Sequence, residues 1–295
     1  MRPRRSVLYM PGANERALEK ARSLPADALI LDLEDAVAPD AKVAARERVC
    51  AAVGSYGERE VTIRVNGAGT PWHADDLRAA GEAGPSAVVV PKVGSAGEVH
   101  AIEEALAHAP DHTAIWAMIE TPAAVLDCAA IAAASERLTV LVLGTNDLAR
   151  EMVAAQVPGR GPLLGPLSMC VLAARATGRV ILDGVFNDVR DAEGFAAECR
   201  QGRDFGFDGK TLIHPAQVGP CNDIFAPSED EVTHAHRVIA AFEQARREGR
   251  GVATVDGRMI ENLHVANAER TLAMARAIST AGDDRAAAGT TRPTA

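Results

Sequence analysis

Short apolar runs alternate with amphipathic stretches along most of this chain. Runs rich in Val, Ile, Leu and Ala are typical of buried strands, and we expect strands at 6–10, 28–33, 61–65, 87–90, 114–119, 140–143, 180–182 and 209–212. Apolar residues at helical spacing predict helices at 14–23, 42–53, 96–107, 122–134, 166–177 and 192–205. Eight strands alternating with helices predict an α/β protein with a (β/α)8 TIM barrel, and a doubly wound open sheet is the alternative.

The barrel pattern is complete before the chain ends. We expect a barrel domain over residues 1–226 and a small C-terminal extension over 227–280 that consists of helices and could act as a lid. In this extension, Gly249 and Gly251 interrupt two helical patterns, one ending near residue 248 and one over 260–278. Small and polar residues dominate 281–295, so a disordered tail is expected there.

Composition narrows the possible partners. Aromatic residues make up only 3% of the chain, so the core must consist of aliphatic side chains. A formal net charge of -9 argues against nucleic acid as a partner. No apolar run approaches the roughly 20 residues that span a bilayer, which predicts a cytoplasmic protein without membrane contact. The five cysteines are widely spaced and predict neither a disulfide framework nor a zinc site.

Charged or titratable residues follow nearly every predicted strand. A (β/α)8 barrel gathers its catalytic groups at the C-terminal ends of its strands. The residues at or near these ends are Glu34, Asp35, Arg64, Lys92, Glu120, Asp147, Asp183 and His214. We therefore expect the active site on this face of the barrel.

Two of these carboxylates favour a hard divalent cation. Glu120 and Asp147 each follow a strongly apolar strand, and no His or Cys cluster accompanies them. Oxygen ligands of this kind suit Mg²⁺, with Mn²⁺ as the alternative ion. The competing interpretation makes both residues ordinary acids at helix N-termini.

Three further sets of charges suggest contacts with an anionic substrate. The planar guanidinium of Arg64 matches a carboxylate, and Glu34 and Asp35 could orient it and hold metal-bound waters. A purely structural Arg–Asp pair is the alternative. Arg16 and Lys20 lie four residues apart on one predicted helix face and could receive phosphates, although such a pair is usually a solvated surface.

Several motifs together resemble one enzyme family. They are Arg5-Ser6-Val7-Leu8-Tyr9-Met10-Pro11-Gly12, Leu31-Asp32-Leu33-Glu34-Asp35-Ala36-Val37, Arg64-Val65-Asn66, Pro91-Lys92, Ile119-Glu120-Thr121, Gly144-Thr145-Asn146-Asp147-Leu148-Ala149, Gly206-Phe207-Asp208-Gly209-Lys210 and Ile213-His214-Pro215-Ala216-Gln217. In this order they resemble the HpcH/HpaI aldolase and citrate lyase superfamily, in its citrate lyase β-subunit-like branch. That branch includes malyl-CoA, β-methylmalyl-CoA and citramalyl-CoA lyases.

The resemblance implies a role for most of the candidate residues. It implies that Glu120 and Asp147 bind Mg²⁺ and that Arg64 binds an α-keto acid and stabilises its enolate. It also implies that Asp35 lies next to the groups that bind the metal without binding the metal itself. It also implies that Arg16 and Lys20 contact the phosphates of coenzyme A. Members of this family resemble one another in forming homotrimers or hexamers.

A C-terminal position departs from the family pattern. The CoA lyases carry a Met-Ile-Asp-like motif whose acid, donated by the adjacent subunit, protonates the enolate. Here the motif ends in Glu261, with Asp256 as a weaker candidate and a helix first-turn acid as the alternative role for Glu261. One extra methylene moves the carboxylate by more than a bond length, which matters for proton transfer.

The expected activity follows from this resemblance. We expect a Mg²⁺-dependent carbon–carbon lyase that acts on a β-hydroxyacyl-CoA of the malyl-, methylmalyl- or citramalyl-CoA type and releases a 2-oxo acid. A thioesterase on the same scaffold is the second interpretation, favoured by Glu261. A CoA-free 2-oxo acid aldolase and a non-catalytic subunit of a lyase complex are the remaining alternatives.

Overall fold

A computed structural model describes residues 2–290 of the chain, with the backbone alone at 283–290. Residues 291–295, within the segment for which disorder is expected, lie outside the described residues. The described residues form two compact units, Arg4–Phe225 and a second unit made of residues 226–290 with residues 2–3. Each unit is described by itself.

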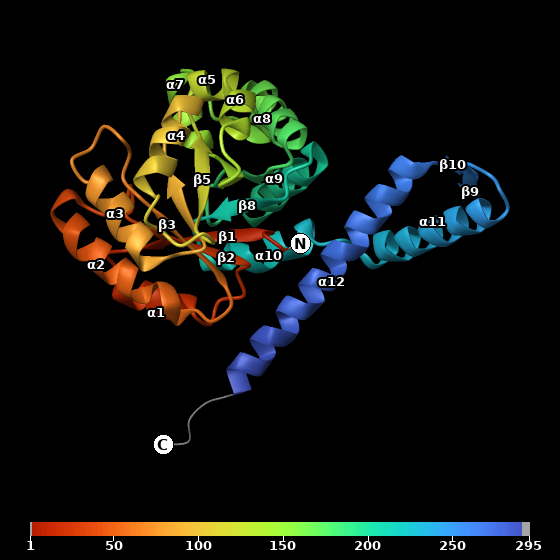
Figure 1. Ribbon diagram of the computed structural model, residues 1–295, viewed down its shortest axis with the longest axis horizontal. Coiled ribbons are helices and arrows are strands. Elements are labelled where there is room, and N and C mark those ends of the chain that lie inside the picture. The colour runs from red at the N-terminus through yellow and green to blue at the C-terminus, as the bar shows by residue number, and fades with distance from the viewer. Residues whose placement is uncertain (1, 291–295) are drawn as a thin grey trace. The chain divides into compact units, whose positions relative to one another are not determined.

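The first unit is a closed barrel of eight parallel strands in sequence order (Figure 1). The strands are β1 (Ser6–Pro11), β2 (Ala28–Asp32), β3 (Glu60–Arg64), β4 (Ala87–Val90), β5 (Ala114–Ile119), β6 (Leu138–Leu143), β7 (Val180–Asp183) and β8 (Gly209–Leu212). The first strand pairs with both β2 and β8, which closes the sheet. The prediction of an α/β protein with a (β/α)8 TIM barrel is therefore confirmed.

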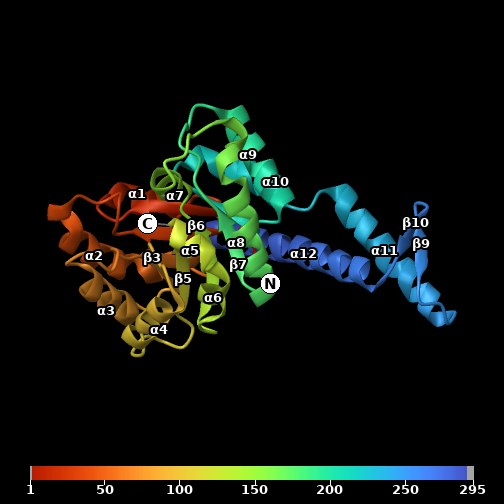
Figure 2. The ribbon, with the colours of Figure 1, turned by 90° about the horizontal axis from the view of Figure 1, so that it is seen from above.

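Helices follow the strands around this barrel, as Figures 1 and 2 show from two directions. They are α1 (Glu15–Ala21), α2 (Lys42–Ala52), α3 (His73–Ala83), α4 (Ala96–Ala105), α5 (Pro122–Leu126), α6 (Cys128–Ala133), α7 (Thr145–Glu151), α8 (Leu164–Thr177), α9 (Ala192–Phe205) and α10 (Val218–Phe225). Four 3₁₀ helices join them, η1 (Pro39–Ala41), η2 (Val53–Ser55), η3 (Pro158–Leu163) and η4 (Pro215–Gln217). The helix expected over 122–134 is divided in two at Asp127, and α3 was not predicted.

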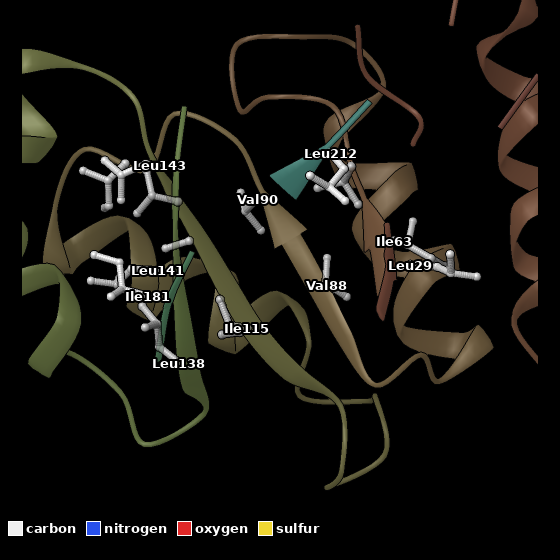
Figure 3. Close-up of a cluster of buried hydrophobic side chains, with 14 of the residues drawn as sticks. Leu29, Ile63, Val88, Val90, Ile115, Leu138, Leu141, Leu143, Ile181 and Leu212 are labelled. Carbon is white, nitrogen blue, oxygen red and sulfur yellow. The ribbon is translucent and has the colours of Figure 1, made fainter. Parts of the chain in front are cut away.

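The strands bury one set of side chains inside the barrel and the other against the helices. One buried cluster contains strand residues alone and fills the interior: Val7, Ala28, Ile30, Ala87, Val89, Trp116, Met118, Val140, Val142 and Leu182. The alternate positions, such as Leu29, Ile63 and Val88, belong to the larger cluster that includes the helices (Figure 3). Aliphatic residues dominate both layers, as the low aromatic content requires.

Alternation continues to the strand ends and selects which polar groups face inward. Because successive side chains of a strand point to opposite faces, Asp32 has the orientation of Ile30, and Glu120 has that of Met118. The register of β2 and β3 pairs Asp32 with Arg64. The alternation that places apolar side chains inside the barrel therefore also places these charged side chains at its C-terminal opening.

The second unit consists of two helices and a hairpin. Its elements are α11 (Glu229–Arg247), β9 (Ala253–Val255), β10 (Arg258–Ile260) and α12 (Asn262–Thr290), and α11 packs against α12. A capping box of Ser228 and Glu231 begins α11. Asp256 and Gly257 form the two-residue hairpin turn with positive φ angles of 52° and 75°. Among the described residues, no helix is both long and apolar enough to cross a membrane.

Candidate active site

A pocket of about 300 Å³ lies at the C-terminal ends of the barrel strands. It is lined by residues from the ends of β1, β2, β3, β5, β6, β7 and β8 and the loops that follow, among them Tyr9, Asp32, Asp35, Arg64, Met118, Glu120, Gly144, Asn146, Asp147 and Asn187. Four of the candidate residues, Asp35, Arg64, Glu120 and Asp147, therefore share one pocket. No two of these four residues are close in sequence, so the fold brings them together.

Arg64 is fixed in this pocket by an acid that the sequence interpretation set aside. Its Nε and Nη2 donate to the two carboxylate oxygens of Asp32 at 2.6 and 2.7 Å. Asp32 is 1% exposed and also accepts the backbone N–H groups of Glu34 and Ala36. We expected Glu34 and Asp35 to orient Arg64, whereas the bidentate partner is Asp32. One guanidinium edge is thus occupied, and the end that carries Nη1 remains directed toward other acids.

Glu34 and Asp35 contact Arg64 unequally. Glu34 Oε2 lies 2.7 Å from Arg64 Nη1, whereas Asp35 Oδ2 is 3.6 Å away on a side chain that is 73% exposed. Burial raises the pKa of Glu34 to about 7, against the opposing effect of Arg64. Glu34 is therefore a carboxyl group that can exchange a proton near neutral pH, while Asp35 is a weak, outer contact.

Glu120 is a deeply buried acid of the pocket, with 2% exposure. Its Oε1 accepts the backbone N–H of Lys92 at 2.8 Å, and Lys92 has a left-handed backbone with a φ of 55°. The absence of a side chain at Gly144 makes room for Glu120, because a Cβ there would overlap Glu120 Oε2. Burial, with the nearby charges of Glu34 and Asp147, raises the pKa of Glu120 to about 8.

Asp147 completes an arrangement that fits Mg²⁺. It lies in the first turn of α7, where Oδ1 is 2.5 Å from Arg150 Nη2. Glu120 and Asp147 supply hard oxygen ligands, and Mg²⁺ usually takes one or two carboxylates and keeps several waters. Within residues 2–290, no cluster of three or more His, Cys, Asp or Glu side chains offers a dedicated metal cage. The donor set thus suits an ion that shares its coordination with water and substrate.

Tyr9 is a residue of the site that sequence reasoning missed. Its ring lies beneath Arg64, with the guanidinium carbon 4.7 Å from the ring centroid. Its hydroxyl contacts Met118 Sδ at 3.9 Å. Burial raises the pKa of Tyr9, so the phenol stays protonated. The signal was present in the sequence, since Tyr9 has the same strand alternation as the interior residue Val7.

Loops from β6 and β7 form one wall of the pocket. Asn146 and Asn187 exchange two amide hydrogen bonds, at 3.0 and 2.8 Å. Both residues also line a second hollow of about 410 Å³ between η3 and α9. The amide pair therefore separates two adjoining hollows next to Asp147.

The remaining strand-end groups have other partners. Lys92 contributes its backbone N–H rather than its exposed side chain. Asp183 is fully buried in ion pairs with Arg160 and Lys210. His214 caps η4, where its Nδ1 accepts the backbone N–H of Ala216. These three side chains are explained by local structure, so a charged residue after a strand is not by itself a catalytic signal.

Four predicted residues do not line the pocket, and Glu34 is one of them. Arg16 and Lys20 are exposed on α1, and neither forms an ion pair with another described residue. Glu261 belongs to the C-terminal unit, where it precedes α12 and its backbone N–H donates to His264 Nδ1. The pocket described above consists of barrel residues alone.

Comparisons with known proteins agree with this architecture. Residues 5–215 match the family HpcH/HpaI aldolase/citrate lyase. A (3S)-malyl-CoA thioesterase of Cereibacter sphaeroides is 52% identical over 94% of this chain and 96% of the relative. An L-malyl-CoA/beta-methylmalyl-CoA lyase of the same species is 34% identical over 94% of this chain and 96% of its own. The crystal structure of CitE from Mycobacterium tuberculosis with magnesium, acetoacetate and coenzyme A has a TM-score of 0.77, with 31% identity over 92% of this chain and 97% of that chain.

These relatives correct the expected activity. The prediction of a carbon–carbon lyase is wrong, because relatives that are 50–52% identical to this chain are named as thioesterases, which are hydrolases. Relatives named as lyases are more distant, at 34–36% identity. Relatives with both names match 94% of this chain, so membership of the family does not by itself separate the two activities.

Proposed function

Because the chain belongs to the HpcH/HpaI aldolase/citrate lyase family, we propose that it is a thioesterase that hydrolyses a malyl-CoA-type β-hydroxyacyl-CoA to coenzyme A and a hydroxy acid. The observation that carries this proposal is the near full-length likeness to relatives named (3S)-malyl-CoA thioesterase. The second interpretation of the sequence thus becomes the leading one.

The shape of the pocket supports a substrate with a small acidic acyl group. Coenzyme A is far larger than a volume of about 300 Å³, so only the acyl end can enter. Arg64 lies inside with 7% exposure. Asp32 holds its Nε and Nη2, and Glu34 lies 2.7 Å from Nη1, so a substrate carboxylate would share Nη1 with Glu34. A guanidinium held in this way binds a carboxylate with defined geometry. We assign it the free carboxylate of the acyl group, which places the thioester toward the pocket mouth.

Mg²⁺ is the cofactor that this site fits. Glu120 and Asp147 would hold the ion, which when bound polarises substrate oxygens and stabilises developing negative charge. The solved relative that contains magnesium and coenzyme A supports a metal of this kind in the family. The Lys92 N–H and the space above Gly144 keep the Glu120 carboxylate in one position for this role.

The hydrolysis requires one proton transfer from water. The water oxygen forms a bond to the thioester carbon and the carbon–sulfur bond breaks. One proton of the water ends on the coenzyme A thiolate, and the other leaves the new carboxylic acid to solvent. Glu34 lies 2.7 Å from Arg64 Nη1, and we assign it to carry this proton, since burial raises its pKa to about 7 and a general base works best near the working pH. Arg64 holds the acyl group meanwhile.

The family's C-terminal acid is not needed for this chemistry. Hydrolysis breaks no carbon–carbon bond and leaves no enolate that requires protonation. Glu261 in place of the lyase Asp is therefore compatible with a thioesterase. We keep Arg16 and Lys20 as the proposed contacts of the coenzyme A phosphates, because both cations are exposed on the helix that follows β1. A trimer or hexamer remains our prediction for the assembly.

Thiol release tests this proposal directly. We expect steady release of free thiol from (3S)-malyl-CoA with Mg²⁺, its loss on treatment with a chelator, and its return when Mg²⁺ is restored. Acetyl-CoA lacks the free carboxylate that we assign to Arg64. Its kcat/KM should therefore be at least about a hundredfold lower than that of malyl-CoA.

The matched variant is Arg64→Lys. It keeps the charge but loses the planar fork, and we expect kcat/KM for malyl-CoA to fall by about a hundredfold. The change Arg59→Lys, at a surface arginine that bonds backbone carbonyls of the first helix region, should leave kcat/KM unchanged. Equal rates for malyl-CoA and acetyl-CoA in the unaltered protein would contradict the proposal.

A further inference from the structure

The hydroxyl of Tyr9 is a strong hydrogen-bond donor with a weak partner. Tyr9 lies at the inward-facing end of β1, and the acceptor that the described residues offer its hydroxyl is the thioether sulfur of Met118 at 3.9 Å. Thioether sulfur accepts hydrogen bonds poorly. A buried phenol normally finds an oxygen or nitrogen partner. The hydroxyl therefore has capacity for an acceptor that enters the pocket.

The position of this hydroxyl identifies which part of a substrate it meets. Tyr9 on β1 lines the pocket, its hydroxyl contacts Met118 on β5, and the guanidinium carbon of Arg64 lies 4.7 Å from its ring centroid. Glu120, also on the β5 side, lines the same pocket. A group bound between Arg64 and Glu120 thus lies over Tyr9.

Substrate orientation then selects one functional group. This step rests on the proposed function, in which Arg64 binds the free carboxylate at the bottom of the pocket. In a malyl group the hydroxyl is attached to the carbon that bears this carboxylate, so it lies one carbon away from the atoms that Arg64 holds. The thioester lies farther out, toward the mouth.

We propose that the Tyr9 hydroxyl donates a hydrogen bond to the hydroxyl oxygen beside the substrate carboxylate, and that Tyr9 thereby selects 2-hydroxy acids over the corresponding deoxy acids. Sites that bond a substrate hydroxyl discriminate strongly against analogues that lack it, because a polar group is then left unpaired. Arg64 supplies affinity for both kinds of acid, and Tyr9 distinguishes them.

Calorimetric binding of two dicarboxylates tests this assignment without turnover. L-malate and succinate, which differ by the one hydroxyl, are titrated into the full-length protein with saturating Mg²⁺. In Tyr9→Phe the ring still covers Arg64, so we expect malate affinity to fall about tenfold while succinate affinity changes by less than about twofold.

The chain contains a matched control in its second tyrosine. Tyr56 is buried, and its hydroxyl donates to the Leu18 carbonyl at 3.1 Å, on the outer side of the barrel among α1 and α2. Tyr56→Phe removes a phenol of the same kind and should leave both affinities unchanged. Circular dichroism of each variant shows whether the fold is retained.

The outcomes separate this inference from the proposed function. Unchanged malate affinity in Tyr9→Phe, an equal loss for malate and succinate, or no malate binding by the unaltered protein would overturn the inference. If Tyr9 discriminates the two acids while malyl-CoA is not hydrolysed, the inference stands and the proposed thioesterase activity fails.

Discussion

Single residues in this site owe their roles to the direction in which a strand presents them. Asp32 and Asp35 are three positions apart, yet Asp32 holds Arg64 by two hydrogen bonds whereas Asp35 is 73% exposed. Asp32 is the last residue of β2 and has the inward orientation of Ile30, whereas Asp35 lies beyond the end of the strand. Arg64 and Glu120 could be predicted from their places at the strand ends. The Asp32–Arg64 pair could not be assigned without the register between β2 and β3.

Gly144 shows how a residue without a side chain shapes the site. We expect Gly144→Ala to weaken Mg²⁺ binding by at least about tenfold, because its Cβ would overlap the Glu120 carboxylate and displace it from the Lys92 N–H. Direct titration of Mg²⁺ by calorimetry measures this effect. The free energy of unfolding should fall by about 1–3 kcal/mol through overpacking.

A matched glycine separates the local effect from a general one. Gly165 lies in α8, and a Cβ there would meet nothing within 4 Å. We expect Gly165→Ala to bind Mg²⁺ as the unaltered protein does. Normal Mg²⁺ affinity in Gly144→Ala would show that Glu120 is not a ligand.

At the scale of elements, a buried ionic cluster joins the last residue of β7 and the start of β8 to α9 and η3. Lys210 Nζ lies 3.0 Å from Asp183 and 2.7 Å from Glu198, and Arg160 Nη1 lies 2.7 Å from Asp183. Asp183 and Lys210 are fully buried. The cluster anchors the start of the β7–α9 loop, which carries Asn187 to the pocket wall.

Loss of one partner in this cluster should destabilise the barrel. Burial alone would raise the pKa of Asp183, but Lys210 and Arg160 together lower it below the usual range. We expect Asp183→Asn to reduce the free energy of unfolding in urea by about 3 kcal/mol at pH 7, since it leaves Lys210 and Arg160 with one less buried counter-charge.

The pH dependence of that difference follows from the sign of the shift. A carboxyl group with a lowered folded-state pKa stabilises the fold above its unfolded value of about 3.9 and loses this effect as pH falls through the lower folded value. The difference between the unaltered protein and Asp183→Asn should therefore be constant from pH 5 to 8 and shrink below about pH 4. Asp188→Asn, at an exposed acid 3.9 Å from Arg190, should change stability by less than about 0.5 kcal/mol. A constant difference down to pH 3 would contradict this account.

Most strands could be predicted from the sequence because apolar residues dominate them, as in β4 and β5. The expected runs at 87–90, 114–119 and 209–212 agree with β4, β5 and β8 at both ends. The helix α3 was missed because it has few large apolar residues. Leu77 is the large apolar residue that it buries, and the rest of the helix is rich in alanine and acidic residues. Its burial comes from tertiary packing against α2 and α4, which a local pattern does not reveal.

At the scale of the whole molecule, fold and activity differ in how far the sequence determines them. The barrel follows from repeated strand and helix patterns, and the family follows from motifs at the strand ends. The activity does not follow in the same way, because a lyase and a thioesterase can share the acyl-group contacts of Arg64 and differ only in which bond breaks afterwards.

The central claim is that water attacks the thioester and that no carbon–carbon bond is cleaved. The most direct measurement is the mass of the products formed from (3S)-malyl-CoA in ¹⁸O-labelled water with Mg²⁺. We predict equal amounts of free coenzyme A and malate, with one labelled oxygen in the malate carboxylate that came from the thioester. Glyoxylate and acetyl-CoA as the initial products would contradict the account.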